Sequence, residues 1–415
     1  MHFQVTHQCP QCGAPVTLGE EDRFFVCPYC RVRSCIDQKG YFRYLLSPSE
    51  RSAEKDDLLY IPYWRFKGTL FTCATENGIG HRFMDLSRLA LAATGDGLPR
   101  SLGFRTQALP LSLVSADTRG RFLAPGNLKD TMADFDRRFV NGRGKENIVF
   151  REYIGEMVSL IYTPVYISGR TLYDAVLDEP VRTFRRDDLD LETLATCRPE
   201  RKTDFISGLC PHCGWDLDGD AESLALVCRN CNSLWRPHKG RLARIRYGCV
   251  TGPDSGDSVL LPFWRIEADI SGVDLASYAD LVRLANLPRT VQPGWEEQPF
   301  SFWTPAFKIR PKIFLRLGRQ LSLTQPAVAL SETIDQRPLY PVTLPPGEAM
   351  ESMKIILAAV LRPARTWIPE LPGITLKPKK ITLSFLPFTD RHHDLYAPSI
   401  RVNINKAILS HATNL

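Results

Sequence analysis

Eight of the twelve cysteines stand in four Cys-x-x-Cys pairs, and such pairs support two kinds of chemistry. A single pair can be a redox dithiol, provided that a helix N-terminus behind a strand lowers the pKa of one thiol. Two pairs together can surround one metal ion with four sulfur atoms. The segment CPYC at 27–30, taken alone, fits either kind. The pairs are Cys9/Cys12, Cys27/Cys30, Cys210/Cys213 and Cys228/Cys231.

The spacing of the pairs favours metal binding. Fourteen residues (13–26) separate the first two pairs, and fourteen (214–227) separate the last two. Each intervening segment begins with glycine, contains an acidic turn (19–22 or 218–220) and returns through an apolar run (24–26 or 224–227). Such a segment predicts a short hairpin that brings its flanking pairs together. The residues after Cys30 indicate strand and turn, whereas a redox dithiol requires a helix there.

We therefore predict two Zn²⁺ ions, each held by four thiolates. A site closed by four thiolates leaves no open position for water or substrate, so both ions are predicted to be structural. Redox thiols or disulfides are the alternative. The other four cysteines have no partner spacing, so we expect small buried apolar side chains there, with an exchanging fifth ligand as the alternative for Cys35. These four are Cys35, Cys73, Cys197 and Cys249.

The first knuckles, CPQCG (9–13) and CPHCG (210–214), closely resemble those of the zinc-ribbon family. The second knuckles, CPYCR (27–31) and CRNCN (228–232), lack the usual final glycine, which makes the turn less favourable but removes no ligand. The chain also resembles a group of bacterial proteins in which a CPxCG ribbon precedes a Y-x-P-[FY]-W strand. That resemblance implies a ribbon followed by a β-rich module, and it carries no established activity.

Internal similarity predicts two tandem copies of one module. The two ribbons are offset by 201 residues, and YIPYWRFKG (60–68) matches LLPFWRIEA (260–268) at offset 200. Segments 123–135 and 162–175 match 344–356 and 385–398 in the same order. We predict zinc ribbon 1 at 1–39, a β-rich α+β domain at 40–200, zinc ribbon 2 at 201–247 and a second β-rich domain at 248–415.

The predicted fold class is α+β, in which each module has a mixed or antiparallel sheet and one or two helices. Helices are expected at 85–93 and 128–140 in the first module and at 275–286 and 348–361 in the second. Apolar residues repeat at helical intervals in 348–361. Strands are expected around 60–71 and 158–176. We expect Trp64 and Trp264 to fill the core; an aromatic platform for a base, peptide or lipid headgroup is the alternative.

The charge and the hydropathy of the sequence bear on nucleic-acid binding, on membrane insertion and on cellular location. The formal charge of +6 lies wholly in residues 201–415, because residues 1–200 hold equal numbers of acidic and basic side chains. Eight thiolates on two Zn²⁺ ions would bring the total to about +2. The sequence has no apolar run long enough to cross a bilayer and no secretion signal, so a cytoplasmic location is expected.

No catalytic motif is recognisable. The phosphate-binding pattern GxxxxGK[ST] is absent, and the nearest string, Gly142 to Lys145, continues to Glu146. The histidines of RHHD (391–394) are expected in a solvent-exposed turn. We therefore predict a non-enzymatic adaptor or scaffold for protein–protein assembly, which could lie beside an anionic membrane surface.

The alternative is nucleic-acid binding through the second ribbon and its basic flank. The flank RPHKGRLARIR (236–246) could contact phosphates, and an adjacent indole could stack on a base. The candidate contacts are Trp235, Arg236, Lys239, Arg241, Arg244 and Arg246.

Overall fold

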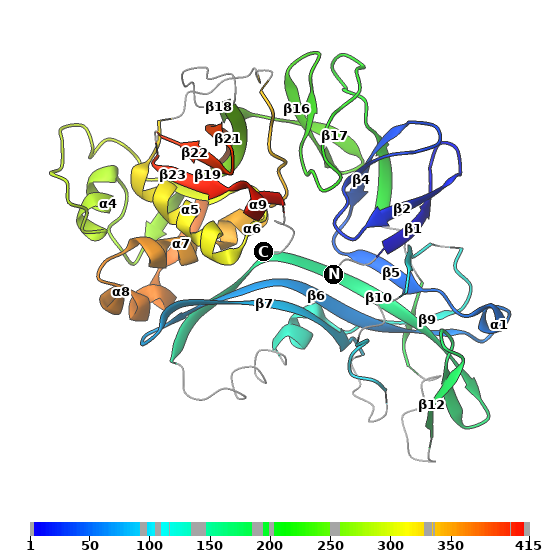
Figure 1. The fold of residues 1–415 in the computed structure, drawn as a ribbon. Helices are drawn as coiled ribbons and strands as arrows, with labels where there is room; N and C mark the ends of the chain where they lie inside the picture. The colour runs from blue at the N-terminus through cyan, green and yellow to red at the C-terminus, as the bar shows by residue number, and fades with distance from the viewer. Residues whose placement is uncertain are drawn as a thin grey trace.

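The computed structural model is a strand-rich α+β fold (Figure 1). Within the described residues, no helix is long and apolar enough to span a membrane. The structure describes residues 4–91, 98–103, 109–115, 117–133, 147–184, 194–198, 203–249, 258–327, 334, 337–398 and 400–410.

The first half is organised by three long antiparallel strands, β6 (Leu59–Ala74), β7 (Gly78–Leu89) and β10 (Ile148–Ser168). They run along one side of the molecule as a curved sheet (Figure 1). The helix α1 (Glu50–Ala53) lies near one end. The same sheet includes β1 (Gln4–Gln8), β2 (Pro15–Gly19), β5 (Phe42–Leu46), β8 (Leu111–Leu113), β9 (Arg121–Leu123), β11 (Thr171–Asp174), β12 (Glu179–Thr183) and β13 (Thr196–Cys197).

The helix expected at 85–93 is wrong, because the described part of that segment belongs mainly to β7. A three-residue turn (75–77) joins β6 to β7, and Gly78 enters the strand with φ of 72°. This tight turn places the whole segment in antiparallel register with β6. Met84 and Leu86, one on each side of Asp85, pack with Phe66 and Leu70. Their spacing of two residues is a strand period, and pairing outweighed the local helical signal.

The second half has a six-stranded sheet covered by helices. The helices expected at 275–286 and 348–361 are confirmed, and the second of them divides into two helices at Ser352. The described part of 128–140, residues 128–133, is helical. The strands are β18 (Tyr247–Cys249), β19 (Ser258–Ser271), β20 (Phe302–Pro305), β21 (Thr375–Arg391), β22 (Asp394–Ala397) and β23 (Val402–Asn405). The helices are α4 (Tyr278–Leu284), α5 (Pro311–Thr324), α6 (Pro346–Glu351), α7 (Met353–Val360), α8 (Ala364–Glu370), η1 (Leu371–Gly373) and α9 (Lys406–Ser410).

The central strand pairs of the two halves have the same register. Pro62 of β6 lies opposite Tyr162 of β10, and Pro262 of β19 lies opposite Phe385 of β21. These are the positions that the sequence comparison matched at offsets 200 and 223. A short parallel strand flanks each pair on the same side, β5 beside β10 and β18 beside β21. An antiparallel strand flanks the other side, β7 beside β6 and β20 beside β19.

The tryptophans of the two matched strands are buried, as expected for core residues. Trp64 is 4% exposed and Trp264 is 6% exposed. Each indole N–H donates to a backbone carbonyl from a later segment, Trp64 to Gly126 at 3.1 Å and Trp264 to Leu344 at 2.9 Å. Both rings therefore fill the space over their sheet, with the polar N–H satisfied.

Part of the first-half sheet belongs to the core of the second half. Phe71 and Cys73 on β6 and Ile154 on β10 are fully buried in the same apolar cluster as Phe314 of α5 and Ile356 of α7. The far ends of the long strands therefore support the helices of the second half. Burial of this apolar surface joins the two halves into one cooperative unit.

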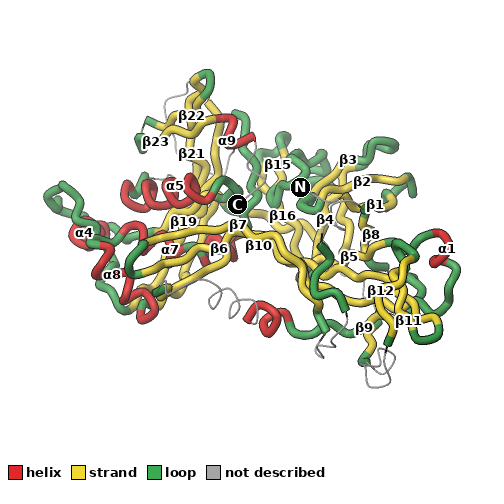
Figure 2. The backbone as a smooth tube through the Cα atoms, turned by 60° about the horizontal axis from the view of Figure 1, so that its bottom comes forward, coloured by secondary structure: helices red, strands yellow, loops and turns green. Residues whose placement is uncertain are grey.

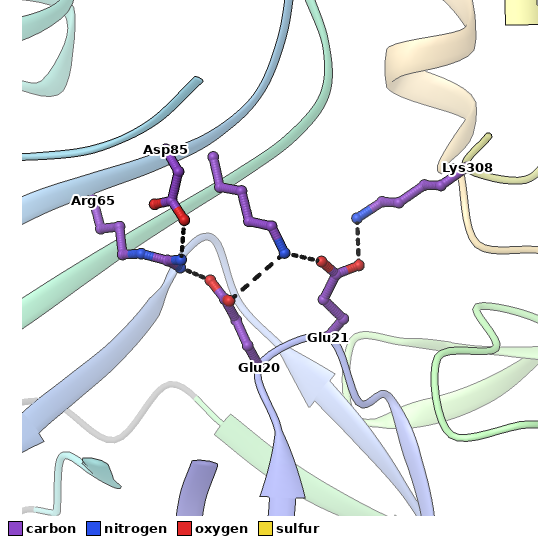
Figure 3. A network of polar contacts seen from close by, with 6 residues as sticks. Glu20, Glu21, Arg65, Asp85 and Lys308 are labelled. Atoms are coloured by element: carbon purple, nitrogen blue, oxygen red, sulfur yellow. Dashed lines mark hydrogen bonds and ion pairs between the residues drawn. The ribbon is translucent and has the colours of Figure 1, made fainter. Parts of the chain in front are cut away.

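The acidic turn of the first ribbon ends between the two halves and forms a buried ion cluster (Figure 3). Glu21 is 6% exposed. Its carboxylate contacts Lys67 Nζ of β6 at 2.6 Å and Lys308 Nζ of the second half at 2.8 Å. One carboxylate thus connects residues that are 46 and 287 positions away in the chain.

The neighbouring residue extends this cluster. Glu20, 1% exposed, contacts the guanidinium of Arg65 on β6, and Arg65 Nη2 also lies 3.1 Å from Asp85 Oδ2 on β7. Three cations and three carboxylates are therefore gathered in one largely buried group (Figure 3). Buried charges of this kind are tolerated only when they compensate one another.

The ion cluster makes stability depend on pH. Burial alone would raise the pKa of Glu21, but the charges of Lys308 and Lys67 outweigh it and hold the pKa at about 2. A depressed carboxyl pKa contributes stability above the unfolded value, near 4.5, and this contribution is lost as the pH falls toward 2. The linked contribution at pH 7 is on the order of 3 kcal/mol.

We expect Glu21→Gln to lower the free energy of unfolding by about 3 kcal/mol at pH 7, because two buried ammonium groups lose their shared counter-charge. Urea denaturation should give a constant difference from the wild type between pH 7.5 and 5, and a shrinking one below pH 4.5. Metal analysis of both proteins at each pH identifies the range in which their zinc content is equal, and the comparison is made within that range. The exposed carboxylate of Glu297 supplies the control, since Glu297→Gln should leave stability unchanged. Equal stability of Glu21→Gln and the wild type at pH 7 would contradict the assignment.

Candidate metal centres

Four sulfur atoms converge in each ribbon, as the spacing predicted. The four ligand atoms of each group lie within 4.8 Å of one another. In the first ribbon the Sγ atoms of Cys9 and Cys30 are 3.7 Å apart, and those of Cys12 and Cys27 are 3.8 Å apart. All these cysteines are free thiols, so the sulfurs are not joined as disulfides.

The second ribbon repeats this geometry. The Sγ atoms of Cys210 and Cys231 are 3.6 Å apart, and those of Cys213 and Cys228 are 3.4 Å apart. A tetrahedron with metal–sulfur bonds of about 2.3 Å has sulfur–sulfur edges of about 3.8 Å. Both groups therefore fit a tetrahedral metal site with four cysteine ligands. Within the described residues these are the groups of His, Cys, Asp and Glu that could hold a metal ion.

The four knuckles share one backbone conformation. In each knuckle the residue four positions after the first cysteine has a positive φ: 72° at Gly13, 63° at Arg31, 74° at Gly214 and 50° at Asn232. Its N–H donates back to the carbonyl of that cysteine in three of them, at 2.9 to 3.0 Å for the Cys9, Cys27 and Cys210 knuckles. Glycine adopts this conformation without strain, and asparagine tolerates it better than arginine does.

Hydrogen bonds in the knuckles lower the pKa of at least one cysteine in each group, whereas the pKa of Cys30 and of Cys228 is raised to about 12 by burial and by the neighbouring cysteine side chains. Hydrogen bonding from the backbone of Cys30 lowers the pKa of Cys27 to about 6, and the side chain of Asn230 does the same for Cys213. Thiolates are the form of cysteine that binds a metal.

The knuckle of Cys9 and Cys12 joins β1 to β2, and the bridge between Leu209 and Asp216 flanks that of Cys210 and Cys213. The second knuckle of each ribbon joins two strands of a small sheet, β3 (Phe24–Val26) to β4 (Arg33–Gln38) and β15 (Leu226–Cys228) to β16 (Ser233–His238), which also pairs with β17 (Arg241–Ile245).

The two ribbons lie side by side and share a core (Figure 2). Strand β14 (Thr203–Ser207), from the segment predicted as the second ribbon, pairs with β4 of the first. Phe24 of the first ribbon packs in one cluster with Leu217, Leu226 and Trp235 of the second. Arg33 of β4 also donates to the Leu217 carbonyl at 2.6 Å. The two centres are therefore held by one joint structure.

The remaining cysteines lie outside both groups. Cys35, Cys73 and Cys249 are buried, as expected for small apolar side chains, and Cys197 is partly exposed. Cys35 lies in the core between the ribbons, where burial raises its pKa to about 12. Cys35 is not among the four sulfurs that converge in either ribbon.

The basic flank of the second ribbon is exposed but divided. Arg236, Lys239, Arg241, Arg244 and Arg246 are all exposed. The register of the β16–β17 hairpin places Arg236 beside Ala243 and Arg244 beside Trp235, so these two arginines lie on opposite faces.

The candidate stacking residue of that flank is not on the surface. Trp235 is 8% exposed, and its indole N–H donates to Ser233 Oγ at 2.7 Å. Its ring packs in the core between the ribbons, because β15 and β16 turn that face inward. An aromatic surface for a base therefore cannot come from this residue.

The other motifs are placed as follows. The RHHD segment forms the turn between β21 and β22, where His392 and His393 are exposed. The string Gly142–Lys145 lies outside the described residues.

The buried roles of Glu20, Glu21 and Arg65 were not predicted. The available signal was an arginine and a lysine at alternate positions of β6, both facing inward in a strand that is otherwise apolar.

Comparisons of this chain with protein-family models, with curated proteins and with solved structures found no match.

We expect the purified protein to hold two zinc ions per chain and Cys27→Ser to hold one. The lost ligand opens the first site while the second keeps its four thiolates. Metal analysis by mass spectrometry measures the content, and thermal unfolding should show a lower Tm because structural zinc contributes folding free energy. Cys197→Ser, outside both groups, should retain both ions. Loss of both ions from Cys27→Ser would show that the sites are not independent.

We expect Arg31→Gly to raise the free energy of unfolding by about 1 kcal/mol, because glycine removes the strain of a positive φ. Gly13→Ala should lower it by a similar amount, since a Cβ there meets nothing within 4 Å and only the φ of 72° opposes it. Chemical denaturation of the zinc-loaded chain measures both. The free energy of unfolding should rise for Arg31→Gly and fall for Gly13→Ala. Changes of the same sign in both variants would contradict the idea that a positive φ is strained at these positions.

Proposed function

We propose that this chain is a non-enzymatic zinc-binding adaptor or scaffold that assembles protein partners. The supporting observation is that each ribbon gathers four sulfurs within 4.8 Å, which suits a closed structural site without a position for substrate. Free thiols throughout suit the reducing environment of the cytoplasm, where we place it. Zinc then contributes to folding, and the surface performs the function.

We further propose that the two halves arose as copies of one ribbon-plus-sheet module. The matching registers at Pro62/Tyr162 and Pro262/Phe385 agree with the sequence offsets, and this supports the idea. Fusion of two copies gives a pseudo-symmetric body whose halves can diverge in their partners. The first half balances its charges, whereas the second half carries the basic excess.

The exposed apolar side chains favour the ribbons as the partner surface. Six large hydrophobic side chains are exposed within the described residues, and four of them belong to the ribbons. Tyr29, inside the second knuckle (27–31), is 65% exposed. Trp215, directly after the third knuckle (210–214), is 60% exposed. Exposed aromatic residues of this kind are enriched in protein interfaces. The other four exposed large hydrophobic side chains are Val26 and Leu209 in the ribbons and Phe83 and Leu177 outside them.

Affinity purification from the native host tests the adaptor proposal. We expect specific proteins to co-purify with the wild type and to be lost from the Tyr29→Ser/Trp215→Ser variant, at unchanged zinc content. The matched control is Phe83→Ser/Leu177→Ser, which removes exposed apolar residues away from the ribbons and should keep the partners. Loss of partners from both variants, or from neither, would overturn the ribbon surface as the binding site.

Nucleic-acid binding is the second candidate, favoured by the five exposed cations of the basic flank. Phosphate contacts release counterions, so such binding weakens steeply as salt rises, whereas an apolar protein interface does not. Fluorescence anisotropy with single- and double-stranded DNA over 50–300 mM salt separates the two. Low-micromolar DNA affinity that Arg241/Arg244/Arg246→Ala abolishes would replace the adaptor proposal.

A further inference from the structure

A cavity of about 550 Å³ lies where both ribbons and both sheets meet. Its walls come from β4, β5, β10, β16, β17, β19 and α6, and from loop segments beside them. The volume falls within the range of roughly 300–1,000 Å³ that is usual for small-molecule sites. The elements that surround it belong to separate apolar clusters, so the cavity lies between cores and not within one.

Two guanidinium groups line this cavity. Arg23, just before β3, lies over the ring of Phe42 with 4.6 Å from Cζ to the ring centroid, and it donates to the carbonyl of Asp22. Arg236 projects from β16. Within the part of the chain that the structure describes, neither guanidinium has a carboxylate at ion-pair distance. Arg23 is partly buried and Arg236 is exposed. Burial lowers the pKa of Arg23, whereas Tyr44 and the carboxylates of Glu21, Asp22 and Glu222 act in the opposite direction.

The nearby carboxylates are held by other groups. Glu21 binds Lys67 and Lys308, and Asp37 Oδ2 accepts from the backbone N–H of Gly240. Glu348, which also lines the cavity, is buried in the first turn of α6, where the helix dipole stabilises a negative charge. The lining therefore includes three cations, Arg23, Arg236 and Lys308, and two carboxylates, Asp37 and Glu348. Because Lys308 is paired with Glu21, the two guanidinium groups are the cations that remain available to an anionic ligand.

The rest of the wall is mainly apolar. It includes side chains from the sheet, both ribbons and the second half, and one face of a buried indole. An apolar wall with a few convergent cations is the composition of a site for an amphipathic anion. The principal apolar contributors are Leu128, Met157, Val158, Ile245, Trp264 and Val342.

We infer that this cavity binds a small amphipathic anion, with its carboxylate or phosphate between Arg23 and Arg236 and its apolar body against Met157, Ile245 and Trp264. Charge-assisted hydrogen bonds from two guanidinium groups fix the head. Because the cavity is bounded by both halves and both ribbons, the ligand stabilises their mutual arrangement as well as its own site.

Isothermal titration of the zinc-loaded full chain tests this inference with decanoate, decyl phosphate and uncharged decanol. We expect both anions to bind at least tenfold more tightly than decanol, since each charged hydrogen bond is worth about a tenfold factor or more. The stronger of the two anions identifies the preferred head group. Saturable binding of neither anion, or equal binding of decanol, would overturn the inference.

Three variants locate the site. Arg236→Met should weaken decanoate binding about tenfold, and the matched Arg244→Met, on the opposite face of the same hairpin, should not change it. Both residues are exposed, so neither change should unfold the protein. Ile245→Trp fills the cavity and should abolish binding of all three probes. Equal weakening by Arg236→Met and Arg244→Met would assign the effect to general surface charge and refute the site.

Discussion

The structure depends on one buried carboxylate that is shared between two lysines of different halves. Glu21 has to enter a low-dielectric interior, and only the simultaneous presence of Lys67 and Lys308 makes that burial tolerable. The reverse also holds, because Lys308 would lose this ion pair without Glu21, and Lys67 would lose its 2.6 Å contact and keep the longer one of 3.8 Å to Glu20 Oε2. The first ribbon is therefore positioned by electrostatics at its turn, while four sulfurs converge at its knuckles.

The corresponding turn of the second ribbon has a different role, which makes the molecule asymmetric. Its residue Asp218 lies 3.5 Å from Arg33 Nη1 of the first ribbon, in a partly exposed pair. Ala221, in the same turn, accepts backbone hydrogen bonds from Arg23 and Phe24. The first acidic turn thus joins the halves, whereas the second joins the ribbons. The result is a chain of contacts in which each ribbon is fixed by the other as well as by its own sheet.

Features set by local chemistry were predictable from the sequence, and features set by distant contacts were not. The two four-cysteine groups follow from spacing, because two knuckles separated by a short hairpin have few alternative arrangements. The inward direction of Trp64 and Trp264 follows from their size and the alternation of a strand. Nothing local distinguishes Glu20 and Glu21 from the exposed acids of an ordinary turn; their burial depends on Lys308, 287 residues further along. The strand β7 and the pairing of β14 with β4 likewise depend on partners that a local pattern does not contain.

The central cavity lies at the junction of the two ribbons and the two sheets. The ribbons share one apolar cluster and the long strands of the first sheet reach into the core of the second half, yet the side chains around the cavity come from several of these clusters. Side chains that belong to no single core remain at this junction, and Arg23 is among them. Arg23 is partly buried at this junction, and the described part of the chain places no carboxylate at ion-pair distance from it, so a bound anion would supply a close counter-charge. The position of Arg23 is therefore the physical reason to regard the junction as a site and not as a packing defect.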